Sequence, residues 1–152
     1  MQLDKVEQII NVAGKTNFSI FELPREYDFA EILPNAYHLR ALEEKTGISI
    51  EQIRDLEQLV SAKQSSDFYV VVESPEKMSI GAINAFLKTL EEPRELVHII
   101  FLTNDSSMLL PTILSRAHCF RIPSHNHITD APEIDPEILK LAKDYIAMTP
   151  ST

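Results

Sequence analysis

Residues 68–116 read FYVVVESPEKMSIGAINAFLKTLEEPRELVHIIFLTNDSSMLLPTILSR, and this stretch decides the fold of the chain. Residues 68–72 are aromatic or β-branched without a polar interruption, which is typical of a strand buried on both faces of a parallel sheet. A helix follows, with Ser79 as its predicted N-cap and Pro93 just beyond its end. Residues 97–102 form a second apolar strand, and a short helix opened by a proline comes after it. The stretch therefore predicts strand, helix, strand and helix in the order of a parallel α/β layer.

The flanking sequence continues the same alternation. Helices are predicted at residues 4–11 and after the capping box of Ser49 and Gln52, and strands at residues 18–23, 37–42 and 117–122. In the helix after Ser49, the residues predicted to face the core are Ile53, Leu56, Leu59 and Val60. Strands separated by helices indicate a three-layer, doubly wound parallel sheet with right-handed crossovers.

Ligands of such sheets bind beyond the carboxyl ends of the strands. In this chain that edge holds Leu23, Glu73, Thr103 and Asn104. A phosphate-binding loop would belong directly after the first strand, but residues 24–36 contain no glycine that could adopt positive φ without cost. The same segment carries Glu26, Asp28 and Glu31, which repel phosphate. We expect no nucleotide to be bound by this segment.

Gly14-Lys15-Thr16 imitates the end of a phosphate-binding loop. Such a loop needs a glycine-rich run before it, and the position of the first glycine holds Ile9. A true loop also follows a strand and opens a helix, whereas here a predicted helix precedes and a predicted strand follows. We interpret the motif as a helix cap followed by two polar residues.

Three segments are distinguished by composition. Residues 1–123 are predicted to form the α/β domain, with a degenerate nucleotide site. Residues 124–135 have little apolar content and read as a linker. Residues 136–148 predict a short amphipathic helix, which is too small to be a domain alone.

The chain is acidic, with a formal net charge of −9 over 152 residues. This balance repels phosphate backbones, and no basic cluster is interleaved with aromatic residues, so strong direct binding of nucleic acid is not expected. No apolar run approaches the ~20 residues that cross a bilayer, and the N-terminus lacks a signal-peptide pattern. These features predict a cytoplasmic protein without a membrane partner. The single cysteine, Cys119, excludes an internal disulfide and is predicted to be a buried, unreactive thiol.

Four motifs carry a family resemblance: IEQIRDL at 50–56, NAFLKTLEEP at 84–93, LTN at 102–104 and LPTILSR at 110–116. Together they resemble the clamp-loader branch of the AAA+ ATPases, in particular the delta-prime subunits of bacterial DNA polymerase III and their gamma-related relatives. The second and fourth motifs are specific as a pair at this separation. The resemblance implies a P-loop-NTPase-like AAA+ fold. Family members continue into a helical lid and a collar domain; we expect these to be largely absent from this sequence, with the helix at 136–148 as a candidate start of a truncated lid.

The resemblance also marks degenerate nucleotide positions. In active members this strand ends in an Asp-Glu pair that orients the magnesium shell and polarises the attacking water. Here the pair is Glu73 and Ser74, and serine cannot accept the proton of water at neutral pH. Thr103 and Asn104 match the family's sensor 1, and without a phosphate loop we expect them to cap the turn after the strand. These degenerate Walker motifs imply no intrinsic ATPase activity and no cofactor of the chain's own.

Arg116 is the catalytic candidate that the resemblance retains. In the family, the arginine of a Ser-Arg-Cys motif projects across a subunit interface and stabilises charge on ATP bound by the neighbour. An arginine finger of this kind contributes ~10³–10⁵ in rate. Ala117 replaces the family's cysteine without changing the charge. The alternative is an arginine that makes a local salt bridge at a helix end.

The resemblance thus implies a non-hydrolysing clamp-loader subunit in DNA replication, with Arg116 as a finger acting in trans. Its partners would be clamp-loader subunits of the gamma/tau and delta types, and ATP with magnesium would be bound only by a neighbouring subunit. Two alternatives stay open. One is a nucleotide-binding ATPase of the same fold that uses Glu73 and a metal, and the other is a protein-interaction module of AAA+ fold.

No metal site is predicted from the histidines. His125 and His127 lie in the predicted linker and lack the further ligands that a closed site requires. His98 alternates with apolar neighbours in a strand and is predicted to be a packed or edge histidine rather than a base.

Overall fold

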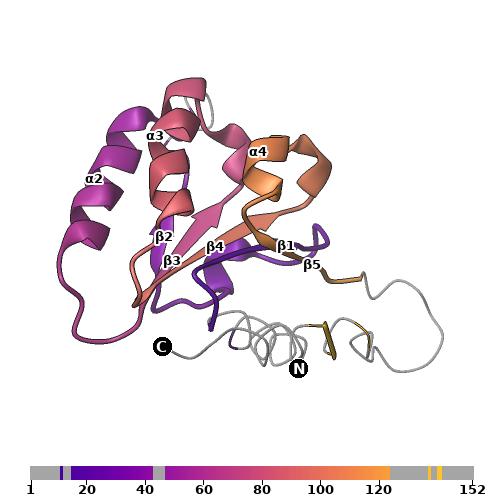
Figure 1. The fold of residues 1–152 in the computed structure, drawn as a ribbon. Coiled ribbons are helices and arrows are strands. Elements are labelled where there is room, and N and C mark those ends of the chain that lie inside the picture. The colour runs from indigo at the N-terminus through magenta and orange to yellow at the C-terminus, as the bar shows by residue number, and fades with distance from the viewer. Residues whose placement is uncertain (1–10, 12–14, 43–46, 124–136, 138–139, 142–152) are drawn as a thin grey trace.

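The computed structural model describes residues 11, 15–42, 47–123, 137, 140 and 141. These residues form a five-stranded parallel sheet with the strand order β2-β3-β4-β1-β5 (Figure 1). The strands are β1 (Phe18–Glu22), β2 (Tyr37–Leu39), β3 (Phe68–Glu73), β4 (Val97–Thr103) and β5 (His118–Arg121). The helices are α2 (Ile50–Ser61), α3 (Ile80–Glu91) and α4 (Pro111–Leu114), with 3₁₀ turns η1 (Phe29–Glu31), η2 (Pro75–Lys77) and η3 (Ser106–Met108). The predicted doubly wound parallel α/β fold is confirmed.

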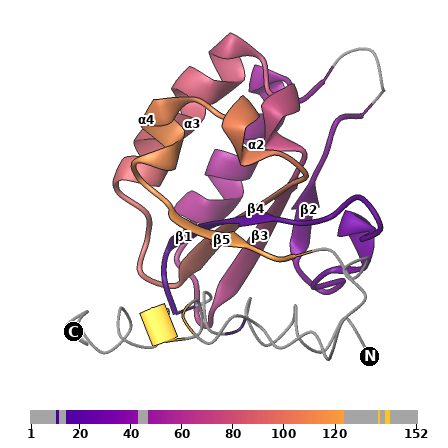
Figure 2. The same ribbon diagram turned by 90° about the vertical axis from the view of Figure 1, so that its right-hand side faces the viewer.

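One face of the sheet is covered by α2, α3 and α4 (Figures 1 and 2). The central strand β4 is buried along its whole length. Its Phe101 packs edge-on against Phe18 of β1 and stacks on Phe86 of α3. This aromatic contact joins the helical layer to the middle of the sheet, so the strand ends on either side are held on a rigid base.

The opposite face is covered, among the described residues, by the segment between β1 and β2. Ile32 of this segment is fully buried with Phe21, Val71 and Leu102 from three different strands. Asp28 caps η1 by accepting a hydrogen bond from the amide of Ala30 at 3.0 Å. The segment therefore packs on the sheet through apolar side chains, directly after β1, where a phosphate-binding loop would lie.

The helix starts follow from local capping. Ser49 Oγ accepts a hydrogen bond from the Gln52 amide at 3.3 Å, and Gln52 Oε1 accepts one from the Ser49 amide at 3.0 Å. Ser79 Oγ likewise accepts from the amide of Ala82 at 3.1 Å at the start of α3. Both caps satisfy amide groups that lack a partner in the first helical turn. Pro111 occupies the first position of α4, as expected.

Three expectations were wrong in detail. Leu59 was predicted to face the core, but it is 44% exposed, because α2 buries only the stripe of Ile53, Leu56 and Val60. The strand predicted at 37–42 ends at Leu39, where its pairing with β3 stops. Cys119 was predicted to be buried, but it is exposed, because β5 is an edge strand.

Several predicted segments lie outside the described residues. These are the helix at 4–11 apart from Asn11, the linker at 124–135 with His125 and His127, and most of the helix at 136–148. Among the residues that are described, no helix has the length and apolar character needed to cross a lipid bilayer.

Candidate functional site

The carboxyl ends of β1, β3 and β4 meet at one edge of the sheet. The parallel register places Glu22 opposite Thr103, and Glu73 opposite Leu102. The structure therefore brings together the positions that the sequence predicted for this edge, on three neighbouring strands. We call this group, with the loops that follow the strands, the carboxyl edge.

Glu73 is held between two basic side chains. Its Oε2 lies 3.0 Å from Nδ1 of His38 and 2.9 Å from Nη2 of Arg40, and its side chain is only 12% exposed. The other ring nitrogen of His38 donates to the carbonyl of Leu33 at 2.9 Å. Each ring nitrogen of His38 therefore faces a hydrogen-bond acceptor, a carboxylate on one side and a carbonyl on the other. Glu73 is thus an ion-paired carboxylate that ties β3 to β2.

Ser74 forms the turn that follows β3. Its backbone is left-handed, with φ of 53° and ψ of 61°, which a residue with a Cβ adopts only at a cost in energy. Its amide donates to the carbonyl of Leu102 at 2.9 Å, and its carbonyl accepts from the amide of Lys77 at 3.0 Å. The residue at the position of the family's water-activating carboxylate therefore leads the chain into η2.

Thr103 and Asn104 make contacts within the protein. The Thr103 hydroxyl donates to Glu76 Oε2 at 3.1 Å and accepts from the amide of Asp105 at 3.2 Å. The Asn104 side-chain amide donates to the carbonyl of Leu23 at 2.9 Å. These bonds cap the turn after β4 and join it to the end of β1.

Glu22 belongs to the carboxyl edge and was missed from the sequence. It accepts from the Ser106 hydroxyl at 2.5 Å and from the Ser106 amide at 2.9 Å, and it pairs with Nε of Arg121 at 3.1 Å. The hydrogen bonds from Ser106 lower the pKa of Glu22, and the positive charge of Arg121 lowers it further. A signal was available, because Glu22 is the acidic residue at the end of a strand that is apolar except for Ser19.

The segment between β1 and β2 has a second backbone feature. Leu33 also has a positive φ, 49°, and its carbonyl is the group that accepts from His38. His38 thus holds this bend in place from the neighbouring strand β2. The bend is thus held by a residue five positions further along the chain, whereas the turn at Ser74 is held by Leu102 of β4.

Arg116 lies away from the carboxyl edge. Its Nη1 donates to the carbonyl of Thr112, its Nη2 contacts Glu91 Oε1 at 2.5 Å, and its side chain is 30% exposed. β5 begins two residues later at His118, opposite Ser19 near the start of β1. Ser19 and Glu22 are three residues apart on β1, which corresponds to roughly 10 Å along the strand at about 3.3 Å per residue. Arg116 is therefore at the amino end of the sheet.

His98 is a packed histidine on β4. Its Nδ1 bonds the carbonyl of Thr16 at 2.7 Å, its Nε2 lies 2.8 Å from Asp67 Oδ1, and its ring stacks on Tyr69.

Burial raises the pKa of Tyr69. No three His, Cys, Asp or Glu side chains among the described residues are grouped as metal ligands.

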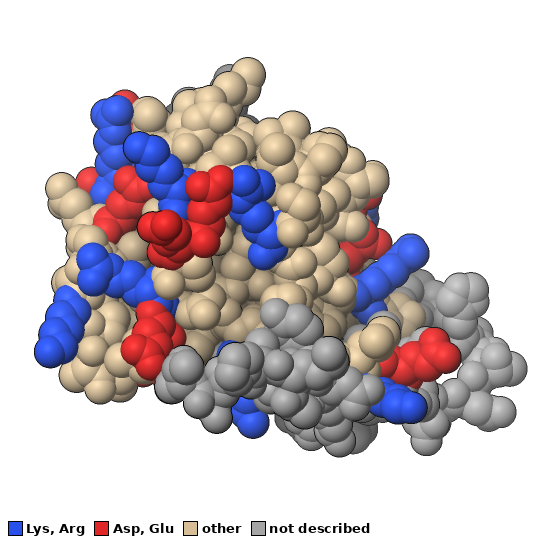
Figure 3. Space-filling view, in the orientation of Figure 1, with Lys and Arg blue, Asp and Glu red and all other residues tan. Residues whose placement is uncertain are grey.

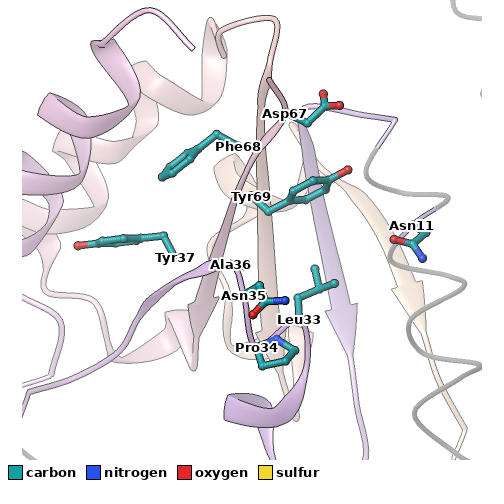
Figure 4. A pocket seen from close by; sticks show the side chains of 9 residues that line it. All are labelled: Asn11, Leu33, Pro34, Asn35, Ala36, Tyr37, Asp67, Phe68 and Tyr69. Carbon is teal, nitrogen blue, oxygen red and sulfur yellow. The ribbon is translucent and has the colours of Figure 1, made fainter. Parts of the chain in front are cut away.

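A pocket of about 400 Å³ lies at the opposite end of the sheet from the carboxyl edge. Its described lining comprises residues 33–37 before and at the start of β2, residues 67–69 at the start of β3, and Asn11. Figure 4 shows Tyr69 and Leu33 extending toward Asn11, and Tyr37 and Phe68 directed to the other side. The pocket brings together none of the positions that the sequence singled out for nucleotide chemistry.

Cys119 has a sulfur that lies 4.0 Å from the carbonyl of Ala117. Although the residue is exposed on β5, partial burial of the sulfur raises the pKa of its thiol. A raised pKa keeps the group in its thiol form at neutral pH, and the thiol is a weaker nucleophile than the thiolate. The expectation of low reactivity therefore rests on this pKa rather than on full burial.

Comparison with known proteins finds subunits of DNA polymerase III. Residues 28–126 match the protein family described as DNA polymerase III, delta subunit. DNA polymerase III subunit delta' of Haemophilus influenzae is 36% identical over 81 residues, which is 52% of this chain and 25% of that protein. Subunit delta' of Pseudomonas aeruginosa is 36% identical over 85 residues, or 55% of this chain and 26% of that protein. Subunit tau of Bacillus subtilis is 36% identical over 99 residues, or 58% of this chain and 18% of that protein. The chain thus covers about a quarter or less of these relatives.

Solved structures show the same fold. A DNA polymerase III gamma subunit-related protein of Thermotoga maritima aligns with a TM-score of 0.65 and 24% identity, covering 97% of this chain and 58% of that chain. A mutant of Thermotoga maritima RuvB aligns with a TM-score of 0.50 and 10% identity over 79% of this chain and 44% of that chain. With the match over residues 28–126 and the delta' relatives, the chain belongs to the DNA polymerase III delta-subunit family, in the delta' branch of the clamp-loader subunits.

Proposed function

We propose that the chain is a delta'-type clamp-loader subunit that hydrolyses no ATP of its own and presents Arg116 to ATP on a neighbouring subunit. The observation that carries this proposal is the internal pairing of the carboxyl edge. Glu22, Glu73, Thr103 and Asn104 all bond to other groups of the chain. A nucleotide at this edge would have to replace those partners.

The surroundings of Glu73 weigh against the alternative of a metal-dependent ATPase. A magnesium ion needs oxygen ligands with free lone pairs, and Oε2 of Glu73 already accepts from His38 and Arg40. The positive charge of Arg40 also repels a cation. Ser74 supplies no carboxylate for activating water. Both features support a site without hydrolysis.

The segment at 24–36 supports the same conclusion. Phosphates are held by successive backbone amides of a glycine-rich loop at a helix N-terminus. Here the segment has no glycine, and it fills the space next to β1 with Ile32, which is fully buried. Its acidic residues disfavour a polyphosphate.

The position of Arg116 supports an action in trans. The side chain lies at the amino end of the sheet, whereas the degenerate nucleotide positions lie at the carboxyl edge. Arg116 therefore does not face the chain's own site. Two of the five guanidinium N–H groups are used in the contacts with Thr112 and Glu91, which leaves others for a phosphate. At that phosphate, the guanidinium would stabilise the charge that develops during transfer.

Partners follow from the same proposal. The relatives that match are named delta' and tau subunits of DNA polymerase III, and we infer that this chain joins subunits of those types. Figure 3 shows basic and acidic side chains intermingled on one face of the molecule rather than a continuous basic surface. With a net charge of −9, this favours protein partners over direct contact with nucleic acid.

The test is the ATPase activity of a tau/gamma-type subunit from the same organism, measured with and without this chain. Arg116→Ala is expected to remove the stimulation by this chain, with a fall in turnover on the order of 10³ or more for a finger that acts alone at its site. Arg25→Ala removes the same charge at an exposed position of the 24–36 segment and serves as the matched control. Equal turnover with wild type and Arg116→Ala would reject the finger and leave the interaction module.

A further inference from the structure

Arg116 has a carboxylate partner that belongs to its own chain. Its Nη2 contacts Oε1 of Glu91, the last residue of α3, at 2.5 Å. Its Nη1 donates to the carbonyl of Thr112, one of the carbonyls that the four-residue helix α4 leaves without a helical donor. One half of the guanidinium is thus held by a neutral backbone group, and the other half by a charged side chain.

The two contacts differ in how easily they are exchanged. Thr112 is four residues from Arg116, and its carbonyl is part of the fixed backbone of α4. Glu91 is a surface side chain, 51% exposed, and its partner is 30% exposed. An exposed ion pair is weak, and its loss changes an equilibrium by no more than about fivefold. Glu91 can therefore leave the guanidinium without disturbing the fold.

A phosphate presents the same chemistry as the carboxylate. Both groups accept parallel N–H bonds from the planar fork of arginine, and a phosphate carries more negative charge. A phosphate that binds the same guanidinium lies close to the Glu91 carboxylate, and the repulsion between the two anions favours the departure of Glu91. Since Thr112 does not compete for Nη2, the exchange of Glu91 for phosphate leaves the guanidinium oriented by Thr112.

We propose that Glu91 is an internal competitor that occupies Arg116 in the isolated chain and is displaced by the partner's phosphate on assembly. This inference rests on the proposed function, because it regulates the same arginine. Glu91 neutralises the finger until a neighbouring nucleotide replaces it. Glu91 therefore raises the concentration of this chain that is needed to stimulate its partner. Its carboxylate touches no reacting atom itself.

The experiment uses the complex with the tau/gamma-type subunit and titrates this chain against a fixed amount of partner. Glu91→Gln keeps the shape of the side chain and removes its charge. The expected result is that half-maximal stimulation is reached at about two- to fivefold lower concentration of this chain, because an exposed pair has been removed. Damage to the fold would shift the concentration in the opposite direction.

Glu92→Gln is the matched control. Glu92 is the next residue, is also exposed, and its amide donates to the carbonyl of Lys88 at 3.2 Å. It makes the same change in net charge and is expected to leave the titration unchanged. The double variant Glu91→Gln with Arg116→Ala is expected to behave as Arg116→Ala alone, because the competitor acts only through the arginine.

The outcomes separate the two proposals. If Arg116→Ala has no effect, the proposed function fails, and the competitor role fails with it. If Arg116→Ala removes stimulation but Glu91→Gln matches wild type or weakens the response, only the competitor role is overturned. A second readout is the NMR signal of the Arg116 guanidinium in the isolated chain. It is expected to be more mobile in Glu91→Gln, where the Thr112 contact remains without the charged partner, than in wild type, and equal mobility in both would also overturn the proposal.

Discussion

At the scale of single residues, Glu22 shows how the carboxyl edge is fixed by partners that are distant in sequence. Ser106 is 84 positions away and donates to Glu22 through both its hydroxyl and its amide. These bonds favour the ionised form and lower the pKa of the carboxyl group, and the nearby charge of Arg121 acts in the same direction. Glu22 therefore couples the folding of this edge to pH.

The sign of that coupling leads to a prediction. Because the pKa of Glu22 is lower in the folded state, its contribution to stability is present above the ordinary pKa of glutamate. It is lost as the pH falls through the lowered pKa. Ser106→Ala removes the hydroxyl donor, so the pKa of Glu22 is expected to rise toward its ordinary value. The free energy of unfolding is then expected to vary less with pH in the acidic range.

Two measurements check this prediction. Carbon-13 NMR of the Glu22 carboxyl group gives the pKa in wild type and in Ser106→Ala, and urea unfolding at several acidic pH values gives the stability. Ser66→Ala removes an exposed serine elsewhere and is the control. An unchanged pKa of Glu22 in Ser106→Ala contradicts the role given to its hydroxyl.

At the scale of elements, the helix starts were predictable because their signals are local. Ser49 and Gln52 are three residues apart and make both bonds of the capping box. The positions of individual side chains were harder to predict, since they depend on neighbours from other elements. Leu59 has helical spacing with Leu56, yet it lies beside the buried stripe of Ile53, Leu56 and Val60 and is exposed. Cys119 is exposed on β5, which is the edge strand of the sheet that the described residues form.

The glycines give a prediction at this scale. Gly47 precedes the bridge between Ile48 and Met78 and has φ of +65°, and a Cβ added to it would lie 2.3 Å from the carbonyl oxygen of Lys77. Gly47→Ala is expected to lower the free energy of unfolding by about 1–3 kcal/mol, because both the backbone angle and the contact are unfavourable.

Gly81→Ala is the matched substitution, and its expected effect on the free energy of unfolding has the opposite sign. Gly81 lies in the first turn of α3, and an added Cβ would make only an ordinary contact with the Ile50 side chain, 3.6 Å from Cδ1. Alanine is expected to raise stability by about 0.5–1 kcal/mol at such a helical position. Urea unfolding of both variants checks the pair, and a loss of stability in Gly81→Ala equal to that in Gly47→Ala would contradict this account.

At the scale of the whole molecule, the sequence predicted the sheet and the edge but not how the edge is closed. The hydrophobic pattern of the strands and the capping signals of the helices indicate which residues lie at the carboxyl ends of the strands. The pairing of Glu73 with His38 and that of Glu22 with Ser106 depend on strand order and register, which no local pattern contains. The left-handed backbone at Ser74 was unpredictable for the same reason, since its amide bonds to Leu102 of β4.

The two ends of the sheet differ in how their polar side chains are bonded. At the carboxyl edge, the polar groups bond to one another, and at the amino end Arg116 contacts Glu91 on the surface. A carboxyl edge whose polar groups are already bonded, and an arginine whose surface partner can be replaced, support the proposal of a subunit that acts on a neighbour's nucleotide. The central claim is that the chain binds no nucleotide at its own edge.

Calorimetric titration of the isolated chain with Mg·ATP tests that claim most directly, with the tau/gamma-type subunit as the positive control. The account predicts no binding heat for this chain up to millimolar ATP, because Glu22, Glu73 and Asn104 keep their partners within the protein. Saturable binding with a micromolar Kd would contradict it.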